Sequence, residues 1–144
     1  MVKANSKTRK ERQNAELLAA SKHMYYEFWM LGEALKKVCN PGDQQGLNCA
    51  LESFGIHARV LTDFLFKSSG WEDDVLAIDY VNDPESWVNY INTKKGIRVY
   101  LTKRVGKEIA HLTYTRLNIG SEEKNWDCAK IHKMITELFL EFLN

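Results

Sequence analysis

The feature that most restricts the fold of this chain is a helical spacing of apolar residues that recurs along most of its length. Side chains three and four positions apart share one face of an α-helix, whereas a β-strand alternates its faces every two residues. Between about Glu11 and Cys39 the stripe runs through Leu17, Ser21, Met24, Phe28, Leu31, Leu35 and Val38. This spacing predicts a long amphipathic helix and excludes a strand.

The same spacing predicts further long helices. The second begins near the N-cap Asp43 and carries Leu47, Leu51, Phe54, Ala58, Leu61 and Leu65. The next covers about Ile97 to Leu117, with its stripe at Ile97, Leu101, Val105, Ile109 and Leu112. The last begins after Ser121 and carries Cys128, Ile131, Ile135, Leu138 and Phe142. Because a short Pro-Gly loop joins the first two helices, we expect an all-α fold, an antiparallel bundle of four long helices.

A short helix and an irregular acidic segment complete the predicted fold. The short helix begins after Asp83, with Pro84 at its first position, where the missing N–H costs nothing, and ends near Lys95. The irregular segment 70–83 carries Glu72, Asp73, Asp74 and Asp79. Their spacing matches no calcium loop, so we expect no metal site and no cofactor. Instead, these residues should cap a short turn or an extended strap within 75–81 and pair with neighbouring bases.

The chain is expected to divide into a flexible basic N-terminal arm, residues 1–12, and a single helical domain, residues 13–144. Two roles for the arm are open, a solvated tail and an arm that contacts phosphates. The chain has 20 Lys and Arg against 19 Asp and Glu, so its overall charge does not attract nucleic acid. A nucleic-acid ligand would therefore need a local basic patch.

Cysteine usage and hydropathy give an expected location. Cys39, Cys49 and Cys128 show no C-x-x-C spacing, so neither a disulfide framework nor a zinc site is expected and a reducing cytoplasm fits. No apolar run approaches the length of a membrane-spanning helix, and the N-terminus lacks the apolar segment of a secretory signal. We therefore expect a cytoplasmic protein without membrane contact.

One pair of residues is not explained by the apolar stripes. Arg104 and His111 are seven positions apart, so on a helix they point the same way, with Cα atoms about 10 Å apart, at the rim of the core. Arg offers phosphate a planar, permanently charged fork, and His moves protons near neutral pH. Together they would cleave RNA without metal, His111 handling the proton of the 2′-OH or leaving group and Arg104 stabilising the phosphorane. The alternative is structural, with Arg104 paired to Glu108 and His111 at the edge of the core.

The second helix also has a charged face opposite its apolar stripe. This face carries Glu52, Ile56, Arg59 and Asp63. It is either simply solvated or, together with Phe66, the place where another helix or a second subunit packs. His57 flanks the stripe and would face the same cleft as His111 if the two helices pack against each other.

The spacing of Arg104 and His111, with Tyr114 one turn further on, resembles the HEPN superfamily of helical-bundle proteins. More closely, ESFGIHARVLTDFLF (52–66), DDVLAIDYV (73–81) and RVGKEIAHLTYTRL (104–117) look like a group of uncharacterised bacterial bundle proteins. The HEPN resemblance implies a homodimer whose two Arg–His pairs meet in a cleft, often a metal-independent ribonuclease of a toxin–antitoxin or antiphage system. In it, Arg104 would be the phosphate clamp and His111 the acid or base.

The preferred hypothesis is a HEPN-like protein that binds RNA or nucleotide phosphate, as a metal-independent endoribonuclease or as a binding protein, controlled by an antitoxin or regulatory partner. Its supporting candidates for phosphate or substrate binding are Lys103, Arg59, His57 and Tyr114. The alternative hypothesis is a non-catalytic helical-bundle interaction or accessory protein, whose interface would contain Ile56 and Phe66.

Overall fold

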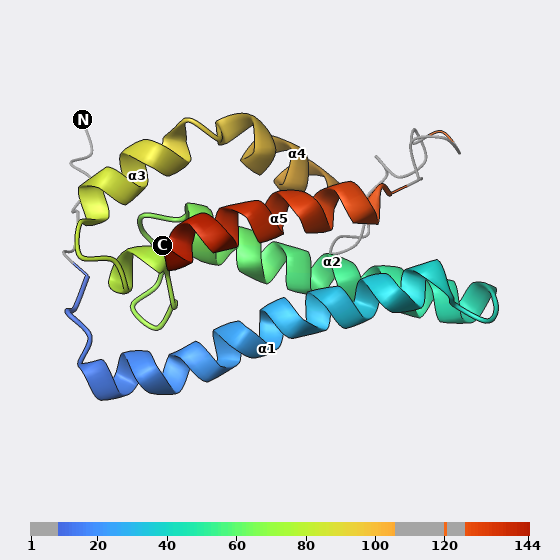
Figure 1. The fold of residues 1–144 in the computed structure, drawn as a ribbon, viewed down its shortest axis with the longest axis horizontal. Helices are drawn as coiled ribbons and strands as arrows, with labels where there is room; N and C mark the ends of the chain where they lie inside the picture. Colours follow the sequence, from blue (N-terminus) through green and yellow to red (C-terminus); the bar gives the residue numbers. More distant parts are fainter. Residues whose placement is uncertain (1–8, 106–119, 121–125) are drawn as a thin grey trace.

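The computed structural model describes residues 9–105, 120 and 126–144, and within them every regular element is helical (Figure 1). The elements are α1 (Asn14–Cys39), α2 (Gln44–Phe66), the 3₁₀ turn η1 (Ala77–Asp79), α3 (Pro84–Asn92), α4 (Lys95–Val105) and α5 (Cys128–Leu143). The predicted all-α class is therefore confirmed for these residues.

Local sequence signals set several of the helix boundaries. Asp43 caps α2 by accepting a hydrogen bond from the backbone N–H of Gly46 (2.6 Å). Gly42 precedes it with φ 82°, a left-handed conformation that suits glycine. Asp83 caps α3 through the N–H of Ser86 (3.0 Å), and Pro84 occupies the first turn. The predicted starts of the second helix and of the short helix are thus confirmed.

Other boundaries differ from the prediction. The last helix begins at Cys128, not after Ser121, because Asp127 caps it by accepting from the N–H of Lys130 (2.9 Å). The first helix begins at Asn14, not near Glu11. The short helix ends at Asn92 and α4 begins at Lys95, and the part of α4 that we predicted beyond residue 105 lies outside the described residues.

The helix α2 is the centre of the fold. It packs against α1, α3, α4, α5 and η1, and α1 also packs against α5. In Figure 1, α5 and α2 lie between α1 on one side and α3 and α4 on the other. The most deeply buried large side chains, all under 2% exposed, are Phe54, Leu31, Leu61, Leu65, Leu76, Leu101, Ile131 and Ile135. The long helices thus turn one stripe each toward a shared core.

An aromatic cluster closes the end of the core near the C-terminus of α5. Phe142 packs edge-on against Phe64 and Trp87, with ring centroids 5.2 and 5.8 Å away. The indole N–H of Trp87 donates to the carbonyl oxygen of Leu65 (3.2 Å), so this buried ring leaves no polar atom unpaired. The cluster holds α3 against α2 and α5.

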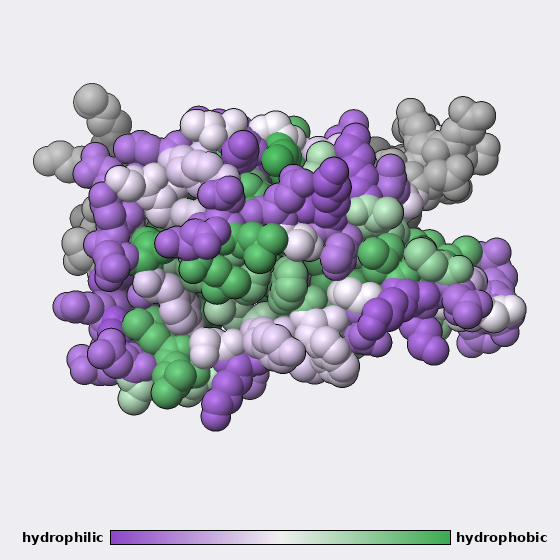
Figure 2. All heavy atoms as spheres, in the orientation of Figure 1, coloured by the Kyte–Doolittle hydropathy of each residue, from purple (hydrophilic) through white to green (hydrophobic). Residues whose placement is uncertain are grey.

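On the face seen in Figure 2, apolar residues gather over the seam between α5 and α1, and hydrophilic residues surround them. Phe28 of α1 stacks on Phe139 of α5 at this seam, with ring centroids 4.5 Å apart. No helix within the described ranges is long and apolar enough to cross a membrane.

Candidate functional site

The predicted catalytic pair lies at the limit of what the structure describes. Arg104 belongs to the last turn of α4, but its side chain lies outside the described residues, as do His111 and Tyr114 entirely. The described surface next to Arg104 is that of the preceding residues of α4.

The helix α4 and its flanks carry charges of one sign only. From residue 86 to residue 107 the chain has no Asp or Glu, and its charged residues are Lys94, Lys95, Arg98, Lys103, Arg104 and Lys107. Within a chain whose formal net charge is +1, this is a marked local excess of positive charge. It is the local basic patch that a nucleic-acid ligand would require.

The fold places three of these cations on the outer side of α4. Leu101 is 1% exposed and faces the core, whereas Lys95, Arg98 and Lys103 are exposed. We call these three residues the basic face. In the part of the chain that the structure describes, none of the three has a carboxylate within ion-pair distance. Their charges are therefore available to an anion from outside.

The stability of α4 does not explain this pattern. Lys95 and Arg98 lie in the first turn, which holds no acidic residue. The positive end of the helix dipole makes cations there unfavourable by about 0.3–1 kcal/mol each. A like-charged pair three residues apart adds a cost of about 0.2–0.5 kcal/mol. Local choices that oppose the fold are characteristic of functional sites, which makes the basic face a candidate site.

A neighbouring cation and an aromatic ring extend the basic face toward α5. The Nζ of Lys130 lies 5.5 Å from the ring centroid of Tyr100, which is half-buried between α4 and α5. On α3, burial first and then the charge of Glu141 raise the pKa of Tyr90. The sequence reasoning missed Lys95, Arg98 and Lys130, although the acid-free run 86–107 could have indicated the first two.

The structure places the predicted supporting residues on different elements. Lys103 belongs to the basic face, and Arg59 is exposed on α2. The ring of His57 is buried and its Nδ1 lies 2.6 Å from the Oε2 of Glu27, so its side chain contacts α1. A paired and buried imidazole has a structural explanation that needs no substrate.

The interface predicted from the second helix needs a correction. Phe66 is only 6% exposed and belongs to the core. Ile56 is 55% exposed, as the prediction requires. A partner that docks on α2 therefore contacts Ile56 without Phe66.

The acidic segment is organised by Arg9, from the end of the predicted arm. The guanidinium donates to both carboxylate oxygens of Asp79 (3.2 and 2.8 Å) and to the carbonyl oxygens of Asp74 (2.6 Å) and Trp71 (3.2 Å). Asp79 also accepts from the N–H of Leu76 (3.1 Å), at the start of η1. The prediction that these acids cap a short turn and pair with neighbouring bases is confirmed for Asp79.

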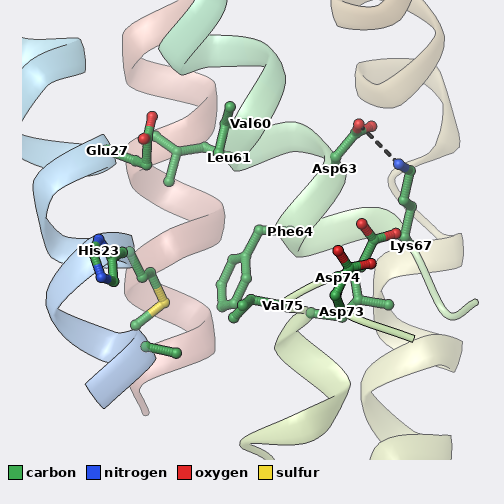
Figure 3. Close-up of a pocket in the computed structure, with 13 residues that line it drawn as sticks. His23, Glu27, Val60, Leu61, Asp63, Phe64, Lys67, Asp73, Asp74 and Val75 are labelled. Atoms are coloured by element: carbon green, nitrogen blue, oxygen red, sulfur yellow. Dashed lines mark ion pairs between the residues drawn. The ribbon is translucent and has the colours of Figure 1, made fainter. Parts of the chain in front are cut away.

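A cleft of about 360 Å³ lies between α1, α2 and the segment 73–76 (Figure 3). Its floor is apolar and includes Leu61, Phe64 and Leu76. Four carboxylates also line it, those of Glu27, Asp63, Asp73 and Asp74, against the single ammonium of Lys67, which pairs with Asp63 (2.9 Å). The cleft is therefore acidic and repels the phosphates that the basic face attracts. The described residues include no group of acidic, His or Cys side chains arranged to hold a metal.

Burial changes the pKa of two titratable groups on α5. Burial raises the pKa of the Cys128 thiol to about 11, so it carries little of the thiolate that a nucleophile needs. Partial burial lowers the pKa of His132, which packs between α5 and α1 near Phe28.

Comparison of the chain with models of known protein families, with curated proteins and with solved structures gave no match. The class that the described residues define is an all-helical protein with one acid-free basic helix on its surface.

Proposed function

We propose that this protein is a HEPN-like helical protein that binds RNA through the basic face of α4. The observation that carries the proposal is a set of exposed cations on a helix without carboxylates, Lys95, Arg98 and Lys103, which are unpaired among the described residues. Phosphates bound there displace condensed counterions, which favours binding without requiring a positive overall charge. The half-buried ring of Tyr100 beside Lys130 would add a surface on which a base can stack.

The proposal includes cleavage of the bound strand by Arg104 and His111. The 2′-oxygen would attack phosphorus and the P–O5′ bond would break, giving a 2′,3′-cyclic phosphate and a 5′-hydroxyl end. His111 would take the 2′-OH proton, or supply the proton that the 5′-oxygen gains, and Arg104 would stabilise the charge of the phosphorane. Lys103, which belongs to the basic face, directly precedes Arg104 in the sequence, and this supports the proposal. The arrangement proposed is an antiparallel bundle of four long helices that acts as a homodimer in the cytoplasm.

The test is the salt dependence of RNA binding, measured by fluorescence anisotropy of a labelled single strand. The double variant Lys95→Glu/Arg98→Glu should bind at least tenfold more weakly. Its plot of log affinity against log salt should be shallower by about 0.7 for each phosphate that the variant no longer neutralises. The matched control is Lys22→Glu/Lys37→Glu, which introduces two acids at exposed lysines of α1. Equal losses of affinity in both variants would show that only the net charge matters and would refute a site on α4.

A second candidate is a non-catalytic interaction protein that binds another protein, such as an antitoxin or a regulator. The exposed aromatic residues of α1 favour it, since Tyr25 is 68%, Tyr26 48% and Trp29 50% exposed. Aromatic side chains are enriched in the centres of protein interfaces. If the wild-type protein binds no RNA even at low salt, this candidate replaces the first.

A further inference from the structure

The outer side of α2 carries an exposed apolar centre between two charges of opposite sign. Ile56 is 55% exposed and Val60, one turn further on, is 42% exposed. Glu52 lies four residues before Ile56 and Arg59 three residues after it, and both are exposed. On a helix these positions share one side, so they form a single stripe with the sequence acid, apolar, base.

Within the described part of the chain, these two charges have no partner: neither side chain makes a hydrogen bond or an ion pair there. Seven positions of helix separate the Cα atoms of Glu52 and Arg59 by about 10 Å, so the two cannot face each other directly. The neighbouring Asp63 is already paired with Lys67 (2.9 Å). Glu52 and Arg59 are thus the charges on this stripe that remain available.

The spacing of this stripe is complementary to itself. When two identical helices cross antiparallel on a two-fold axis near Ile56, position 52 of each helix comes opposite position 59 of the other. An isologous interface requires this self-complementarity, because one patch must serve as both partners. A random protein partner has no reason to carry the same order of charges at the same distance.

We infer that a second copy of this chain docks on α2, with Ile56 at the two-fold axis and Glu52 of each copy paired with Arg59 of the other. The inference rests on the homodimer of the proposed function and gives its interface. It is argued from α2 and does not use α4, so dimer formation and RNA binding can fail separately.

Aromatic residues of α1 enlarge the apolar part of this interface. The ring of Tyr26 packs edge-on against His57, the residue after Ile56, with centroids 6.1 Å apart, and lies 6.4 Å from the ring of Trp29. Both aromatic side chains are about half exposed. A stable interface buries about 800 Å² on each partner, which one helical stripe does not supply by itself. The hairpin of α1 and α2, with its aromatic residues beside Ile56, comes closer to that area.

Charge reversal tests this arrangement, with the oligomeric state measured by sedimentation velocity. The two-fold axis repeats the Glu52–Arg59 pair, so a single substitution places like charges opposite each other at two points of the interface. Glu52→Arg and Arg59→Glu should therefore each weaken the dimer at least tenfold. The double variant Glu52→Arg/Arg59→Glu should dimerise as the wild type does, because it exchanges the two charges. A mixture of the two single variants should form a heterodimer, since each changed charge then faces an opposite charge on the other chain.

The control is Lys37→Glu, at an exposed residue of α1 outside the stripe, which should leave the dimer intact. All the substituted residues are exposed, so the thermal midpoint of each variant should stay close to that of the wild type. A wild-type chain that remains monomeric at the highest attainable concentration overturns the inference. So does a dimer that persists in both single variants, because its interface then lies elsewhere.

Discussion

At the scale of single residues, a buried histidine helps to hold the bundle together. His57 joins α2 to α1, because its Nδ1 lies 2.6 Å from the Oε2 of Glu27. Both side chains are largely shielded from water. Removing either partner leaves a shielded polar group unpaired, which costs about 1–3 kcal/mol. By comparison, the exposed pair of Lys36 and Glu33, at the same 2.6 Å, contributes about 1 kcal/mol at most. Burial, not distance, decides which of the two pairs matters.

His132 should make the stability of the protein depend on pH. Partial burial lowers its pKa in the folded state below the ordinary value of 6.5, so the unfolded chain binds the proton more readily. The contribution of the neutral ring is fully present above pH 6.5 and falls as the pH drops below that value. Urea unfolding at several pH values should therefore show stability decreasing from neutral toward acidic pH.

His132→Gln should flatten this pH dependence because it removes the titrating group while keeping a polar side chain of similar length. His23→Gln, at an exposed histidine of α1, is the matched control and should keep the slope of the wild type. A slope unchanged in His132→Gln would assign the effect to another group.

At the scale of elements, Arg9 fixes a segment that has little regular structure of its own. Between Lys67 and Asp83 the only regular element is the single turn η1, yet Leu76 and Ala77 are buried there. Arg9 joins three points of this segment, and its ion pair with Asp79 is well shielded, with side chains 16% and 9% exposed. The segment 71–79 therefore keeps its position through a residue far away in the sequence.

Arg9→Ala should release this segment selectively. Amide hydrogen exchange at residues 71–79 should become faster, while the buried stretches of α2 and α5 keep their protection. Lys10→Ala is the control because it removes an exposed neighbouring cation. Faster exchange throughout the molecule would instead show that Arg9 supports the global fold.

The elements also show what the sequence can and cannot predict here. Apolar spacing is enough to predict the helices α1, α2 and α5, because apolar residues of each stripe pack in the common core. Capping residues predict the starts of α2 and α3, but the start of α5 at Cys128, with its cap Asp127, was not predicted. The pairing of Arg9 with Asp79 spans 70 positions, so its partners came only from the fold. Phe66 is buried although it lies off the main stripe of α2, because periodicity within one helix does not show which other elements pack against it.

At the scale of the whole molecule, positive and negative charges lie on different surfaces, although the formal net charge is only +1. Positive charge collects on α4, whereas carboxylates line the cleft between α1, α2 and the segment 73–76. Exposed charges act over about 10 Å at moderate salt, so each surface affects a ligand separately. A polyanion is attracted to one surface and repelled from the other, which orients it without any excess of total charge. The dimer proposed on α2 would use the outer side of that helix, where Val60 also lines the cleft.

The proposed ribonuclease requires binding and chemistry to be separable in the intact protein, and His111→Ala should separate them. Cleavage of a labelled RNA should fall by about a hundredfold or more, since proton transfer by a positioned residue contributes at least that much. The thermal midpoint and the RNA affinity should stay near those of the wild type, because the basic face is untouched. His23→Ala, at an exposed histidine, should cleave normally.

A His111→Ala protein that unfolds would make His111 part of the core edge, and one that still cleaves would move the chemistry to other residues. A wild type that binds RNA without cutting it would leave α4 as a binding surface alone.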